Sequence, residues 1–287
     1  MSTGFDALLP AEIAEKAEAV GVAKTRLDVL SLFTLAALGG AFIALGGMFA
    51  TTVLAGADGA LPFGVSRLLS GVVFCLGLIL VIVGGAELFT GNTLMVMALA
   101  AGKVGLREML RAWTIVYAGN FVGAVGTAAL VFLSGQYLGG KGAVAAVALN
   151  IALNKVSLPV SHAFFLGILC NVLVCLAVWL AFGARTTTDK ILAILFPVSA
   201  FVVAGFEHSV ANMYLIPLGL FIVSWAPAEL WSQIGSTPQA FAAMTWPAFA
   251  WSLVPVTLGN IIGGGGLVGA VYWFIYLRTR GAEGGAE

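Results

Sequence analysis

Six apolar segments, each long enough to cross a lipid bilayer, constrain this chain more than any other feature of its sequence. A helix needs roughly 20 apolar residues to span the hydrocarbon core. The segments cover residues 29–56, 67–101, 112–134, 161–183, 191–225 and 248–277. Charged residues make up only 9% of the chain, whereas a soluble domain carries about a quarter. We therefore expect an all-α membrane protein with six transmembrane helices.

Two of these segments are interrupted near the middle by a carboxylate. Residues 67–101 and 191–225 are too long for one simple crossing, and they contain Glu87 and Glu207 respectively. An ionisable group at membrane depth is costly and usually functional. A polar interruption in an overlong apolar segment is typical of a discontinuous membrane helix. The sequence therefore predicts two broken helices.

The two interruptions repeat one motif. Gly-x-Glu followed by an asparagine begins at Gly85 and again, 120 positions later, at Gly205. The pattern Gly-Asn-x-x-Gly likewise occurs at Gly119 and at Gly259. Three crossings invert the chain, so two halves of three segments have opposite orientations. We expect an inverted 3+3 repeat whose functional site lies where the broken helices meet near the midplane.

Lysine and arginine are divided unequally between the two sides of this predicted bundle. Ten lie at the two ends of the chain or in the connections after segments two and four. Only three lie in or beside the other connections, namely Arg67, Lys141 and Lys155. By the positive-inside rule both termini are cytoplasmic. The predicted parts are a cytoplasmic amphipathic segment 1–28, a channel domain 29–277 and a cytoplasmic tail 278–287.

The composition argues against several classes of partner and site. The net charge is zero and no basic cluster lies outside the short connections, so we expect no nucleic acid partner. The three cysteines fall inside apolar segments without a C-x-x-C pair, which predicts neither a disulfide framework nor a zinc site. No metal and no cofactor are expected.

His208 is the sharpest functional candidate. Its ring offers a donor and an acceptor when neutral, and two donors when charged near physiological pH. It could donate a hydrogen bond to a small anion or exchange a proton with it. The alternative is a histidine satisfied by neighbouring backbone groups. An intramembrane enzyme that uses Glu207 and His208 as an acid–base pair also stays open, although no metal triad or activated nucleophile accompanies them.

The remaining candidates each have a structural alternative. We expect Glu87 and Glu207 to cap the free amide groups at the two breaks. Thr90 follows the apolar residues Leu88 and Phe89 in the first break. Its hydroxyl would form part of a narrow gate, or it would serve ordinary loop packing. Lys155 would attract anions at a pore mouth or simply be a solvated lysine. Interhelical hydrogen bonding is the default role of the four asparagines Asn120, Asn171, Asn212 and Asn260.

Several motifs resemble those of the formate/nitrite transporter family. They are Glu87-Leu-Phe-Thr90, Gly119-Asn120, Gly205-Phe-Glu-His-Ser-Val-Ala-Asn-Met213, Ile216-Pro217 and Gly259-Asn-Ile-Ile-Gly-Gly264. The similarity extends from about Lys24 to Arg278 and is greatest to the formate channel branch. It implies an aquaporin-like fold, a homopentamer with one path in each protomer, and a fivefold axis that does not conduct.

The resemblance also implies roles for individual residues. Thr90 and His208 would face each other across the path, with Asn212 and Asn260 around the histidine and Lys155 and Asn171 in a polar vestibule. Two apolar constrictions would be formed by Phe74, Leu78, Leu88, Phe89, Val174 and Phe201. The N-terminal helix would swing to plug the path at low pH. Glu87 stands where one formate channel of the family has an aspartate.

From this resemblance we expect a channel or transporter for small monovalent anions in a bacterial inner membrane. Formate is the first candidate substrate, with nitrite, hydrosulfide, acetate and lactate as related ones. A nitrite or hydrosulfide channel of the same family is one alternative. A water or neutral-solute channel is another, because inverted repeats also permit it.

Overall fold

The computed structural model describes residues 7–279 and confirms the all-α membrane fold. The first half contains α1 (Pro10–Thr25), α2 (Val29–Leu54), α3 (Phe63–Gly84), the short α4 (Phe89–Asn92) and α5 (Val96–Ala100), and α6 (Leu106–Leu133). The second half contains α7 (Ala143–Val156), α8 (Val160–Gly183), α9 (Thr187–Val203), α10 (Ser209–Trp225), α11 (Ala228–Gln233), α12 (Trp246–Ile261), a π-helical stretch (Ile262–Ala270) and α13 (Val271–Tyr276).

Five helices of the described residues are long and apolar enough to cross a membrane. They are α2, α3, α6, α8 and the continuous helical segment that ends with α13. The predicted segment 191–225 is instead two helices of 17 residues each, α9 and α10, and neither reaches the length of a span. The sixth crossing is therefore made of two half-helices.

Both predicted breaks are present. Helix α3 ends at Gly84 and α4 begins at Phe89, while α9 ends at Val203 and α10 begins at Ser209. Gly85 and Gly205 have φ angles of 83° and 73°. Glycine adopts this left-handed conformation without the steric cost that a Cβ would impose. The repeated glycine therefore ends α3 and α9 at the same point of the motif.

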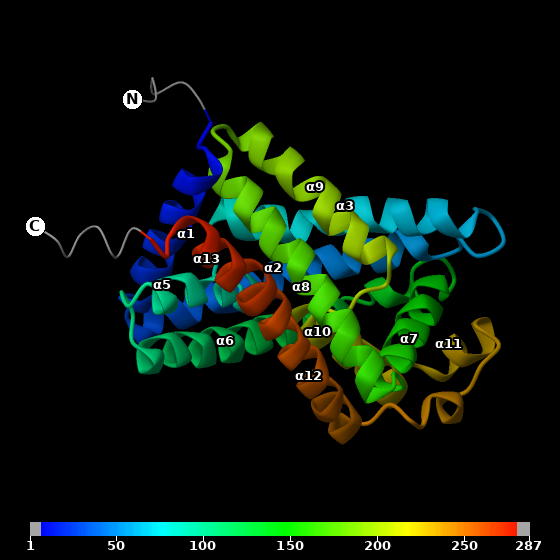
Figure 1. Ribbon diagram of the computed structural model, residues 1–287. Helices are drawn as coiled ribbons and strands as arrows, with labels where there is room; N and C mark the ends of the chain where they lie inside the picture. The colour runs from blue at the N-terminus through cyan, green and yellow to red at the C-terminus, as the bar shows by residue number, and fades with distance from the viewer. Residues whose placement is uncertain (1–6, 280–287) are drawn as a thin grey trace, which may run out of the picture.

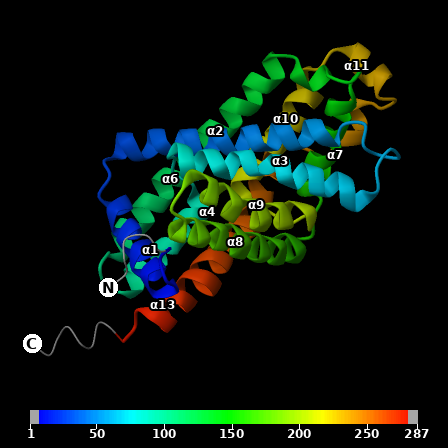
Figure 2. The ribbon, with the colours of Figure 1, turned by 90° about the horizontal axis from the view of Figure 1, so that it is seen from above.

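The two halves pack in the same way. Helix α2 contacts α3 and α6 as α8 contacts α9 and α12, and α3 packs against α9 to join the halves. In Figure 1, α1 and α13 lie at one end of the bundle, and α7 and α11 lie at the opposite end. The same separation is visible from above in Figure 2.

Helix α7 was not predicted from the sequence, which left residues 135–160 as a connection. Its 14 residues are rich in alanine and too few to span a bilayer. It precedes α8 as α1 precedes α2, and it packs against α10. The repeat thus includes a short helix in each half. The predicted tail 278–287 and the first six residues lie mostly outside the described residues.

The repeated Gly-Asn-x-x-Gly motif brings helix backbones into contact. A Cβ on Gly123 of α6 would overlap the carbonyl oxygen of Ala37 in α2. A Cβ on Gly263 would overlap the carbonyl oxygen of Ile168 in α8. Small residues permit this approach in lipid, where no hydrophobic force drives helices together. The close packing holds each Gly-Asn helix against the first long helix of its own half, α2 or α8.

Candidate transport path

The second break presents an imidazole at the start of a helix. His208 is the N-cap of α10, and its Nδ1 accepts the amide hydrogen of Ala211 at 3.0 Å. A neutral ring whose Nδ1 is an acceptor carries its hydrogen on Nε2. Nε2 lies 3.0 Å from Oγ1 of Thr90, to which it can donate. Both side chains are buried, so the two breaks meet at one hydrogen bond inside the protein.

The asparagines of the Gly-Asn motifs hold the broken backbone. Asn260 accepts the Ser209 amide hydrogen at 3.0 Å and donates to the carbonyls of Gly167 and Glu207 at 2.8 and 3.0 Å. Asn120 does the same in the first half. It accepts the Phe89 amide hydrogen at 2.9 Å and donates to the carbonyls of Ala36 and Glu87 at 2.7 and 2.8 Å. Irregular backbone at membrane depth needs such partners.

The glutamates do not cap the breaks, so that prediction was wrong. Glu207 accepts from Nζ of Lys155 at 2.8 Å and from Nδ2 of Asn212 at 2.7 Å. Glu87 accepts from Nζ of Lys24 at 2.8 Å and from Nδ2 of Asn92 at 2.7 Å. The amides at the breaks are bonded by the asparagines and His208 instead. Each carboxylate is thus free to pair with a lysine from α1 or α7.

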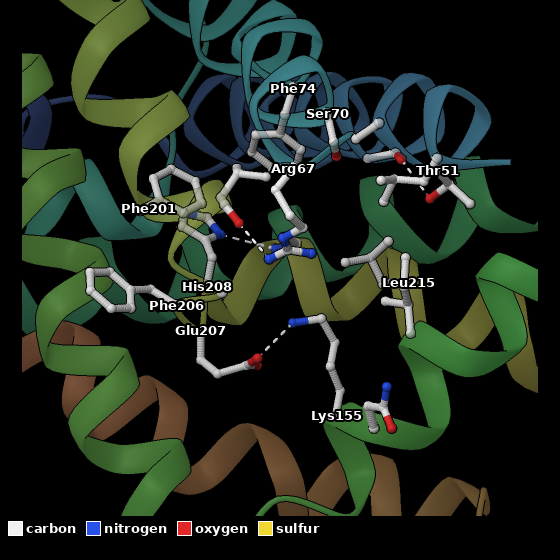
Figure 3. Close-up of a pocket in the computed structure, with 18 of the residues that line it drawn as sticks. Thr51, Arg67, Ser70, Phe74, Lys155, Phe201, Phe206, Glu207, His208 and Leu215 are labelled. Atoms are coloured by element: carbon white, nitrogen blue, oxygen red, sulfur yellow. Dashed lines mark hydrogen bonds and ion pairs between the residues drawn. The ribbon is translucent and has the colours of Figure 1, made fainter. Parts of the chain in front are cut away.

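Two cavities lie on either side of the Thr90–His208 contact. The α7-side cavity has a volume of about 270 Å³, and its walls include Arg67, Lys155, Glu207, His208 and the rings of Phe74 and Phe201 (Figure 3). The α1-side cavity has a volume of about 420 Å³, and its walls include Lys24, Leu78, Glu87, Leu88 and Asn92. Each cavity therefore holds one lysine–glutamate pair.

Aromatic rings narrow the space between these cavities. Phe74 and Phe201 meet edge to face with centroids 5.7 Å apart, and Phe201 stacks on His208 at 6.0 Å. Leu78 and Leu88 line the other cavity. Phe89 differs from the expected constriction residues, because its ring packs against Trp113 and Tyr117 of α6 and lines neither cavity. Its amide is held by Asn120, and this directs the side chain towards α6.

Asn171 lies behind the first break instead of in a vestibule. Its Nδ2 donates to the carbonyls of Thr90 at 3.1 Å and Asn260 at 2.7 Å, and it lines neither cavity. A Cβ on Gly264, in the π-helical stretch, would overlap the Asn171 and Thr93 side chains. Val174, one helical turn further along α8, is also buried. Asn171 thus supports Thr90 from behind. The Oδ1 atoms of Asn171 and Asn212 have no partner within the described residues.

Sequence reasoning missed two cations of the site. Lys24 was used only to predict the orientation of the chain. The repeat could have identified it, because each half has a lysine shortly before its first long helix. Arg67 likewise was used only to predict the orientation. Its Nη2 donates to the carbonyl of Val202 at 2.5 Å, at the end of α9. Nothing in the sequence near Arg67 indicates this contact across 135 positions.

The site consists of two broken helices that meet at a buried polar contact between two cavities. This arrangement defines a membrane transport protein of the channel type. The sequence comparisons name the family. The family model for the formate/nitrite transporter matches residues 11–274, and the chain belongs to this family.

Several proteins similar to this chain are named formate channels. The formate channel FocA of Escherichia coli K12 is 45% identical over 96% of this chain and 97% of its own length. FocA of Haemophilus influenzae is 40% identical over 92% and 93%. A solved pentameric formate channel with formate bound superimposes with a TM-score of 0.83 at 41% identity, covering 87% of this chain and 98% of the other. These relatives are transport proteins, which rules against the intramembrane enzyme.

Proposed function

We propose that this chain is a formate channel that also accepts related small monovalent anions. The observation that carries the proposal is the hydrogen bond between Thr90 and His208, because it joins the two breaks between the two cavities. Relatives that are named formate channels match nearly the whole chain, which supports formate as the substrate.

The cost of moving an anion through this path is desolvation. A bare charge near the bilayer centre loses its water, and the low-dielectric surroundings replace little of that hydration. The N-terminus of α10 offsets part of the cost, because the helix dipole favours negative charge there. The Nε2–H of His208 adds a donor at the narrow point. Formate crosses the ring pair Phe74–Phe201 and the leucines Leu78 and Leu88 as a hydrogen-bonded anion or as the neutral acid.

The proposed assembly is a homopentamer in a bacterial inner membrane. The solved relative with formate bound is described as pentameric, and large hydrophobic side chains cover the outside of the described bundle. The unequal distribution of lysine and arginine supports cytoplasmic termini. The α1-side cavity then opens to the cytoplasm and the α7-side cavity to the opposite side. The N-terminal segment 1–28 is the proposed acid gate, because α1 forms part of the α1-side cavity wall at Val20 and Lys24.

Competitive flux in proteoliposomes tests the proposal. Purified protein is reconstituted, and uptake of labelled formate is measured alone and against nitrite, hydrosulfide, acetate and lactate. We expect saturable formate flux that nitrite and hydrosulfide reduce. Osmotic swelling with water or glycerol but no anion flux would favour a neutral-solute channel. Flux of nitrite or hydrosulfide that exceeds formate flux would assign the chain to another branch.

A further inference from the structure

We propose that Arg67, and not Lys155 alone, supplies the positive charge that receives the anion in the α7-side cavity. This inference rests on the proposed function, since the anion is formate. The guanidinium of Arg67 and the ammonium of Lys155 point into one cavity from different walls (Figure 3). Arg67 belongs to α3, and Lys155 belongs to α7.

The charges of the cavity walls do not cancel. Lys155 pairs with Glu207 at 2.8 Å, and the Lys155 and Glu207 side chains are 15% and 6% exposed. Arg67 is in no ion pair among the described residues. Two cations and one carboxylate leave a formal charge of +1, and the geometry assigns it to Arg67. In a cavity with low-dielectric walls, one uncompensated charge raises the local concentration of a counter-ion.

Arg67 also has hydrogen-bond donors to spare. A guanidinium offers five N–H groups. In Arg67, Nε donates towards the carbonyl of Val203 at 3.5 Å and Nη2 donates to that of Val202. The remaining donors are free to bind the two oxygens of a carboxylate side by side, which is the geometry that arginine favours. The C-terminal end of α9 carries partial negative charge, so these carbonyls hold the guanidinium in place.

The position of Arg67 suits an entry site. Arg67, Ser70 and Phe74 all line the cavity, and their spacing of three and seven residues places them on one face of α3. Phe74 belongs to the ring pair at the narrow end. An anion held by Arg67 therefore lies about two helical turns before the aromatic constriction.

Two substitutions separate charge from shape. We compare labelled formate uptake by the wild type, Arg67→Gln and Arg67→Lys, at formate concentrations well below half-saturation and at saturation. We expect Arg67→Gln to lower flux at low formate roughly ten-fold, the lower end of electrostatic steering, and to change saturating flux much less. Arg67→Lys should recover most of the loss. A merely structural role would lower both fluxes and the melting temperature, and would not be rescued by lysine.

A second pair keeps the inference testable if Arg67→Gln does not assemble. Leu54 is an apolar wall residue of the same cavity. Leu54→Glu neutralises the excess charge without touching Arg67, and Leu54→Gln is its size-matched control. We expect only the glutamate variant to lose low-formate flux. Equal low-formate flux in Leu54→Glu and Leu54→Gln, or in Arg67→Gln and the wild type, would overturn this inference and leave the proposed function intact. Absence of formate flux in the wild type would overturn the proposed function and the inference with it.

Discussion

Nε2 of His208 lies 3.0 Å from Oγ1 of Thr90, so a hydrogen bond joins the break after α3 to the break after α9. These residues are 118 positions apart in the chain. The other ring nitrogen accepts the Ala211 amide hydrogen, which fixes the tautomer with its hydrogen on Nε2. A second proton on Nδ1 would face that amide hydrogen. The cap therefore holds a neutral donor beside Thr90, at the point where the two cavities approach each other.

Replacing His208 should lower formate flux without shifting its pH dependence. His208→Phe removes both the donor to Thr90 and the cap of α10, whereas His208→Asn retains a cap acceptor for the Ala211 amide. Because the cap keeps the ring neutral, we expect His208→Phe, which lacks the Nε2–H donor, to lower formate flux by a similar factor throughout about pH 5 to 8, and we expect the asparagine variant to be the more stable one. Formate uptake in liposomes and thermal unfolding measure the two effects. Undiminished formate flux in His208→Phe would remove the histidine from the mechanism.

Breaking one lysine–glutamate pair should cost more stability than removing both partners. Lys155→Met leaves Glu207 buried with only Asn212 as its partner. We expect a loss of roughly 3 kcal/mol, the low end for a broken buried pair, since this one borders a cavity. The double variant Lys155→Met/Glu207→Gln leaves no unpaired charge and should recover much of that loss. Unfolding of the purified protein in detergent gives the comparison, and strictly additive losses would contradict it.

Truncation of the N-terminus has two separable effects. Deleting residues 1–24 removes the proposed acid gate, but it also removes Lys24 from Glu87, to which it bonds at 2.8 Å. Lys24→Met is the matched control, because it removes only the ion pair. We expect the truncated protein to lose acid inhibition of formate flux and Lys24→Met to retain it. The gate is rejected if the truncated protein is still inhibited by acid.

Two glycines of α6 should respond oppositely to alanine. A Cβ on Gly123 would overlap the backbone of Ala37, whereas a Cβ on Gly126 has no atom within 4 Å. We expect Gly123→Ala to separate α2 from α6 and to lower the melting temperature and the assembled yield. Gly126→Ala should be neutral or stabilising by up to about 1 kcal/mol, because alanine favours helix. Thermal melting of both variants in one detergent measures this, and equal melting temperatures would contradict the packing argument.

Local patterns predicted the features that local chemistry controls. The two breaks follow from Gly85 and Gly205, whose conformations end a helix wherever it packs. The glutamates at the breaks were recognised as polar exceptions, yet their capping role was wrong. Whether Glu207 accepts from a backbone amide or from Lys155 depends on the position of α7. The sequence did not reveal α7, because it is too short to be recognised as a transmembrane helix.

The sequence by itself determined that this chain is a membrane protein of two similar halves, each with one broken helix, because apolar length and a glycine-containing polar interruption act within a few residues. Tertiary structure decided the partners: Thr90 with His208, Lys24 with Glu87, and Arg67 with the end of α9. The physical reason is that each of these contacts joins separate helices. The geometry of these contacts depends on how closely the helix backbones approach each other at their small residues. This approach is a property of the packed bundle.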